Sequence, residues 1–145
     1  MRGAPKLLMV CLVVYVGISL SWSTAAAQDV VVIANKDAPS DILEPDAIKK
    51  IFLGDIINWE NNDVIMVALL EEKEIHEAFL KKYIKRTSSQ FENVWRRNLF
   101  TGKGAMSMKL KSADEIVGYV QKTKGAIGYV PSETTLPADV KVVGK

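Results

Sequence analysis

The stretch "AIKKIFLGDIINWENNDVIMVALL", residues 47–70, joins an expected helix to an expected strand. Ile48, Ile51 and Phe52 recur at the spacing of one buried helix face. Gly54 follows them and can take the left-handed conformation that closes a helix. The apolar run at residues 64–70 then predicts a strand that is buried on both faces.

The same two patterns alternate along the rest of the chain. Further strands are expected at residues 30–34, 126–130 and 140–143, and a glycine-containing loop at residues 100–112. Further helices are expected at residues 73–85, from Ser89 and from Ser112, where Ser89 with Glu92 and Ser112 with Glu115 form capping-box patterns. The order β-α-β-α-α-α-β-β predicts an α/β domain with a mostly parallel sheet and helices on both faces.

The helix expected from Ser89 has an apolar stripe. We expect this stripe to face the core, and it consists of Phe91, Val94, Trp95 and Leu99.

The first 27 residues have the pattern of a secretory signal peptide. Arg2 and Lys6 precede an uncharged apolar run at residues 7–20, and a small-residue site ends at Ala27. The run is shorter than the roughly 20 residues of a membrane span, which is the alternative. We therefore expect cleavage before Gln28, export to the bacterial periplasm, no stable membrane anchor after cleavage, and one domain at residues 28–145.

The composition of residues 28–145 excludes several function classes. This part has 17 basic and 17 acidic side chains, so it carries no excess positive charge for nucleic acid or a membrane surface. The single cysteine, Cys11, lies within the expected signal peptide and not at its cleavage point. We therefore expect no lipid anchor, no disulfide and no thiol nucleophile in the mature domain.

Three segments resemble a known family. "AIKKIFLGDIINW", "FTGKG" (residues 100–104) and "GAIGYVP" (residues 125–131) occur in the order and spacing of the second lobe of phosphate-binding proteins from ABC uptake systems. The chain most resembles short, single-lobe members of the type 2 periplasmic-binding-protein (PBP) superfamily. The resemblance implies that Trp59 covers the sheet edge where the chain enters its second strand. The alternative is that Trp59 stacks on a ligand.

One loop departs from this family. In the phosphate binders, the loop after the second-lobe strand carries an Arg and a Ser-Gly-Thr stretch, which hold the anion at a helix N-terminus. Here the loop and its helix read "LLEEKEIHEAF", residues 69–79, and only Phe79 matches the family pattern. Glutamates suit a solvated helix N-terminus but repel phosphate. No family anion ligand is carried over.

A glycine loop and two arginines remain as candidates for an anion site. The loop supplies backbone N–H groups and one lysine, and the arginines lie about one helical turn upstream. The alternative is a simple turn beside a solvated helix face. The candidate ligand-binding residues are Thr101, Gly102, Lys103, Gly104, Arg96 and Arg97.

The sequence predicts neither catalysis nor a resident metal or cofactor. His76 is the only histidine and lacks a cysteine or histidine partner for a metal. As a general base it would need a nucleophile brought near by folding, so we expect a surface or capping role. The glutamates at residues 71–77 lack the ligand spacing of a calcium loop. Met66, Met106 and Met108 are expected to fill gaps in packing.

Two functions therefore stay open. The resemblance implies a non-enzymatic, solute-binding-like protein of a phosphate ABC transporter, which binds phosphate or another small anion weakly. The alternative is a protein-interaction module or accessory subunit of an envelope complex that has lost ligand binding.

Overall fold

The computed structural model describes residues 28–103 and 106–145. The predicted signal peptide, Gly104 and Ala105 lie outside the described residues. In chain order the elements are β1 (Val30–Asn35), α1 (Pro45–Phe52), β2 (Met66–Leu70), α2 (Lys73–Phe79), the π-helical turn η1 (Leu80–Ile84), α3 (Ser88–Thr101), β3 (Met106–Leu110), α4 (Ala113–Lys122), β4 (Ala126–Pro131) and β5 (Val140–Gly144).

The strands form one five-stranded sheet in the order β3-β2-β4-β1-β5. β2 runs parallel to β3 and β4, whereas β1 runs antiparallel to β4 and β5. The predicted α/β class is confirmed, but the sheet is mixed rather than mostly parallel. Helical crossovers link β2 to β3 and β3 to β4, which accounts for the parallel pairs. β1 pairs with β4 and β5, which come from the far end of the chain. No helical crossover connects β1 directly to either of them, so β1 is not constrained to run parallel to its neighbours.

Strand β3 corrects the sequence prediction of a loop at residues 100–112. It pairs with β2 along its whole length, from Met66 opposite Met106 to Leu70 opposite Leu110. Its sequence, MSMKL, alternates apolar and polar side chains with the period of a strand. The preceding glycines obscured this short pattern.

The N-terminal caps of two helices also differ from the prediction. Helix α3 is capped by Thr87, whose hydroxyl accepts from the Gln90 N–H while the Gln90 side chain accepts from the Thr87 N–H. Ser89 is already inside the first turn, so the predicted cap at Ser89 is wrong. At α4, the Ser112 hydroxyl accepts from the Glu115 N–H as predicted, but the Glu115 carboxylate accepts from the Lys111 N–H instead of completing the box.

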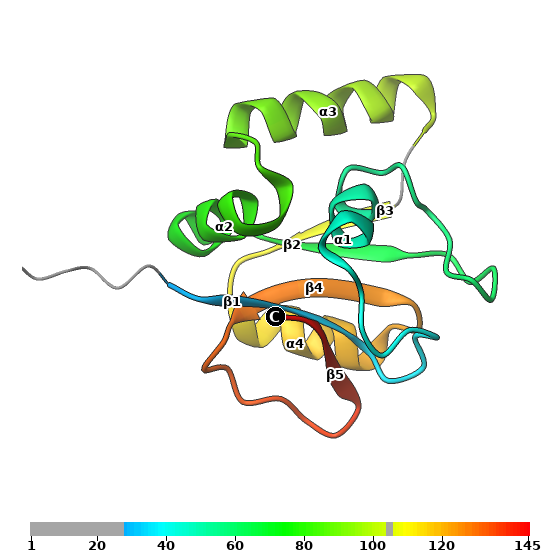
Figure 1. Ribbon diagram of the computed structural model, residues 1–145, viewed down its shortest axis with the longest axis vertical. Coiled ribbons are helices and arrows are strands. Elements are labelled where there is room, and N and C mark those ends of the chain that lie inside the picture. The colour runs from blue at the N-terminus through cyan, green and yellow to red at the C-terminus, as the bar shows by residue number, and fades with distance from the viewer. Residues whose placement is uncertain (1–27, 104–105) are drawn as a thin grey trace, which may run out of the picture.

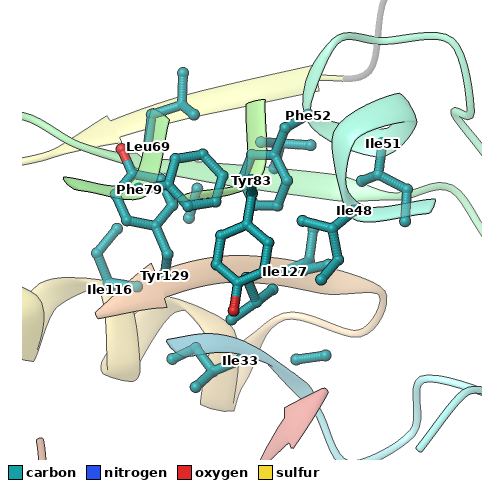
Figure 2. Close-up of a cluster of buried hydrophobic side chains, with 14 of the residues drawn as sticks. Ile33, Ile48, Ile51, Phe52, Leu69, Phe79, Tyr83, Ile116, Ile127 and Tyr129 are labelled. Carbon is teal, nitrogen blue, oxygen red and sulfur yellow. The ribbon is translucent and has the colours of Figure 1, made fainter. Parts of the chain in front are cut away.

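Helices cover both faces of the sheet (Figure 1). Helix α4 packs on one face, and α1 and α2 pack on the other, with α3 outside them. Between the sheet and the α1–α2 layer, the Phe79 ring stacks on Tyr129 with centroids 3.9 Å apart and meets the edge of Phe52 at 4.7 Å (Figure 2). In residues 28–103 and 106–145, no helix is long and apolar enough to cross a membrane.

Helix α3 contributes only part of its apolar stripe to this core. Phe91 and Trp95 are buried, Val94 is half-buried, and Leu99 is 77% exposed. The prediction that Leu99 faces the core is therefore wrong, because the adjacent Asn98 holds the buried position at this end of α3 and donates to the Leu53 carbonyl.

Candidate functional site

A groove of about 310 Å³ lies between helix α3 and strands β2 and β3. We call it the α3–β3 groove. Its lining includes Leu69 and Lys109, which lie near the carboxyl ends of β2 and β3, the side of open α/β sheets where ligands bind. Its lining residues are Leu69, Phe91, Glu92, Trp95, Arg96, Leu99, Ser107 and Lys109.

Two side chains of α3 attach this helix to the end of α1. The Trp95 indole N–H donates to the Phe52 carbonyl at 2.9 Å, and the Asn98 amide donates to the Leu53 carbonyl at 2.9 Å. Both acceptors are carbonyls that a helix C-terminus leaves without intrahelical partners. Gly54, with φ of 80°, lies so close that a Cβ there would come within 2.8 Å of the Asn98 amide nitrogen. Gly54 therefore ends α1 and leaves room for α3 to dock.

The α3–β3 groove combines an apolar floor with charged walls. Leu69, Phe91 and Trp95 are buried beneath it. Arg96 and Lys109 bring positive charge to the groove, and Glu92 brings negative charge. Such a lining suits a ligand that has both an apolar part and an anionic group, since each part then finds a complementary surface.

A smaller pocket of about 170 Å³ adjoins the groove and shares Leu69, Phe91, Glu92 and Lys109 with it. Leu70, Glu71 and His76 complete its lining, and we call it the His76 pocket. The sequence predicted a surface or capping role for His76. Instead its ring is half-buried, 5.6 Å from the Phe91 ring between centroids, and its Nδ1 lies 2.5 Å from the Tyr129 hydroxyl oxygen.

The hydrogen bonds of Tyr129 indicate the tautomer of His76. Burial raises the pKa of Tyr129 well above its ordinary value, so the hydroxyl keeps its proton. Its oxygen accepts from the Leu70 N–H at 3.0 Å. The hydroxyl proton then goes to His76 Nδ1 at 2.5 Å rather than to the Leu70 carbonyl at 3.4 Å. This assignment leaves the proton of neutral His76 on Nε2.

His76 makes stability sensitive to pH. Burial lowers the pKa of His76, Lys109 also lowers it, and Glu92 and Glu77 raise it. Because the folded pKa lies below that of the unfolded chain, the unfolded state binds the proton first as pH falls. We expect the free energy of unfolding to decrease between about pH 7.5 and 5.5, at no more than about 1.4 kcal/mol per pH unit.

Urea titrations across this pH range measure the effect. His76→Gln, which can still accept a hydrogen bond from Tyr129 but does not titrate, should show a flatter dependence. Equal slopes for the two proteins would show that His76 does not cause the pH dependence.

Among the described residues, the candidates for an anion site lie at the C-terminal end of α3 and do not surround one hollow. Thr101 ends α3, and its hydroxyl donates to the Arg97 carbonyl at 3.0 Å. Gly102 closes the helix with φ of 68°, Lys103 is exposed, and Gly104 lies outside the described residues. This loop follows a helix C-terminus, whose carbonyls and dipole oppose an anion.

The two adjacent arginines also separate. Arg96 lines the α3–β3 groove, while Arg97 lines a shallow depression with Arg86 and Asn93. Consecutive helix positions do not share a face. Lys109 replaces Arg97 as the partner of Arg96, and the sequence could not identify it because residues 106–110 were expected to form a loop.

A second hollow, of about 600 Å³, lies between η1 and the start of α3. Lys81, Lys85 and Arg86 line it together with Glu77. We call it the η1–α3 hollow, and its positive charge makes it the comparison site for any anion-binding measurement.

The acidic loop has the solvated character that the sequence predicted. Glu71, Glu72, Glu74 and Glu77 are all exposed. Across residues 28–103 and 106–145, no group of three His, Cys, Asp or Glu residues could hold a metal ion.

The comparisons with known proteins agree with this architecture. A sequence profile described as the PBP superfamily domain matches residues 22–144. The chain belongs to the PBP superfamily domain family. No curated protein matches the chain.

Solved structures show the same fold. A crystal structure from Clostridium perfringens, of a protein assigned to the phosphate ABC transporter substrate-binding proteins and holding bound phosphate, matches 79% of this chain with a TM-score of 0.60 and 20% identity. PstS from Borrelia burgdorferi matches 79% with a TM-score of 0.58 and 14% identity. An ABC-type phosphate transport receptor from Vibrio cholerae matches 79% with a TM-score of 0.52 and 14% identity. This chain covers only 43%, 46% and 44% of these three chains, respectively.

Proposed function

We propose that this PBP domain is an exported, non-enzymatic protein of the solute-binding type, which binds a small anion such as phosphate weakly in the α3–β3 groove. The observation that carries the proposal is the placement of Arg96 and Lys109 in one groove near the carboxyl ends of parallel strands. The fold shared with phosphate-binding proteins supports an anion as ligand. An ABC transporter is the corresponding partner.

The affinity should be low for two reasons. Glu92 lines the same groove, and Glu71 lines the adjoining pocket, so carboxylates lie near any bound anion. The groove is also open, so a bound anion stays in contact with water, which weakens its attraction to the cations. We expect a dissociation constant in the roughly millimolar range and weaker binding as salt is added.

Isothermal titration with phosphate at low and moderate ionic strength tests this expectation. Lys109→Ala and Arg96→Ala should each weaken binding several-fold. Lys103→Ala tests the glycine loop, and Arg86→Ala tests the η1–α3 hollow; both should leave the affinity unchanged. A micromolar, salt-resistant site, or a loss confined to Arg86→Ala or Lys103→Ala, would contradict this assignment.

Export has a separate test. We expect the intact mass of the protein recovered from the periplasm to correspond to residues 28–145, because the signal-peptide pattern ends at Ala27. A recovered protein that retains residues 1–27 would favour the membrane-anchor alternative.

A specific observation favours a protein-interaction module as the second candidate. Leu99, which lines the groove, is 77% exposed, and Phe100, the next residue of α3, is 85% exposed. Large apolar side chains that gather at one place on a surface are characteristic of contact with another protein. Failure to bind phosphate in the titration would leave this candidate as the better one.

A further inference from the structure

We propose that the outer edge of β3 and the α3–β3 groove bind an extended segment of a partner protein, which adds to the sheet as a strand and presents carboxylate side chains to Arg96 and Lys109. This interaction uses the cations of the proposed anion site but does not require affinity for free phosphate. Three features of the described residues carry it.

The first feature is a difference between the two edges of the sheet. At the β5 edge, the Leu43 N–H donates to the Val143 carbonyl at 2.7 Å, and the Lys141 ammonium donates to the Ala38 carbonyl at 2.7 Å. A preceding loop therefore covers that edge. Within the described residues, β3 pairs only with β2, and no loop donates to or accepts from its outer side. An uncovered edge is a template for strand addition.

The second feature is the set of backbone groups that this edge presents. The Leu110 carbonyl accepts from the Glu71 N–H, so Leu110 directs its backbone groups toward β2. Alternate residues of a strand direct these groups to opposite sides, so Ser107 and Lys109 direct theirs outward. The side chains of these same two residues line the α3–β3 groove. A segment that bonds to their backbone therefore also contacts the groove.

The third feature is the chemistry of the surrounding side chains. Leu99 is largely exposed beside the groove and offers apolar contact. Arg96 and Lys109 outnumber Glu92 in the groove, and the exposed Lys111 directly follows β3. A segment with β-branched residues and Asp or Glu complements this surface. A second copy of the chain is less complementary to this surface, because its own β3 edge would bring the same cations to it.

Nuclear magnetic resonance titration of the purified protein tests the inference with a defined probe. The probe is a short capped peptide of β-branched residues with two Glu on one face, and the matched peptide carries Lys at the same two positions. We expect the Glu peptide to shift the backbone amide signals of Ser107 and Lys109 and to bind roughly tenfold more tightly than the Lys peptide.

Variants separate strand addition from simple charge attraction. Lys109→Glu should reverse the preference between the two peptides, whereas Lys122→Glu, on α4 at the opposite face, should leave it unchanged. Ser107→Pro removes one outward N–H, a change that edge strands accept, and should abolish peptide binding. Ser107→Thr keeps the N–H and should bind normally. Circular dichroism confirms that each variant is folded, and Lys109→Glu provides the test if Ser107→Pro does not fold.

The contrary outcomes are equally specific. Absence of shifts at Ser107 and Lys109 with both peptides would overturn the inference, as would equal affinity for the two peptides. A dimer of the wild-type protein that Ser107→Pro converts to a monomer would assign the edge to a second copy of the chain instead.

Discussion

Phe79→Ala is expected to lower the free energy of unfolding by about 3–5 kcal/mol, the usual cost of removing a buried aromatic ring. The Phe79 side chain is fully buried between α2 and the sheet, and its ring stacks on Tyr129 and contacts Phe52 (Figure 2). Truncation therefore removes apolar contacts to a strand and to another helix at once. Because a domain of this size has about 5–15 kcal/mol of total stability, the variant should be only marginally folded.

Urea denaturation followed by circular dichroism measures this loss. Leu99→Ala is the matched control, since it removes a side chain that the sequence placed in the core but the structure exposes. It should change stability by no more than about 0.5 kcal/mol, as surface substitutions do. A cost below about 1 kcal/mol for Phe79→Ala would show that α2 is not packed on the sheet in this way.

The parts of the fold that the sequence predicted are those with long or strongly patterned segments. The buried runs became β1, β2 and β4, and the apolar spacing of residues 48, 51 and 52 became the buried face of α1. Strand β3 was missed because its alternation is short and follows glycines. Leu99 was misassigned because the buried position at this end of α3 belongs to Asn98, a polar residue that an apolar pattern does not count.

The candidate site was less predictable, because contacts distant in sequence create it. His76 meets Tyr129, 53 residues away, and Asn98 reaches Leu53 across 45 residues. Lys109 joins Arg96 only because β3 is a strand beside α3. The proximity of Arg96 and Arg97 in sequence was misleading, since neighbouring helix positions point in different directions. Residue types alone therefore identified one of the two cations in the groove.

The resemblance to the phosphate binders implied a structural role for Trp59, and the structure confirms it. Trp59 is 5% exposed, and its indole N–H donates to the Gly125 carbonyl at 3.0 Å. The same carbonyl accepts from the Met66 N–H at 3.1 Å, where the chain enters β2. Gly125 has φ of 78°, and a Cβ there would lie 2.5 Å from the Val64 carbonyl oxygen. Trp59 thus packs over a junction where only glycine fits.

Trp59→Ala should consequently cost about 3–5 kcal/mol, because it leaves a cavity at this junction and removes the indole hydrogen bond. Trp59→Phe keeps most of the ring volume, and Met66 still donates to the Gly125 carbonyl, so its cost should be smaller. Loss of the indole hydrogen bond should lower the free energy of unfolding by about 0.5–1.5 kcal/mol. Imperfect packing of the smaller ring adds to this cost.

The two Trp59 variants also decide between a structural role and ligand stacking. Trp59 is not among the residues that line the α3–β3 groove or the His76 pocket, so folded Trp59→Phe should bind phosphate and the Glu peptide as the wild type does. Urea denaturation and the two titrations are performed on the same preparations. We expect a lower free energy of unfolding and an unchanged ligand affinity, because Trp59 packs between β2 and Gly125. An unchanged free energy of unfolding with a lost ligand affinity would instead assign Trp59 to ligand stacking.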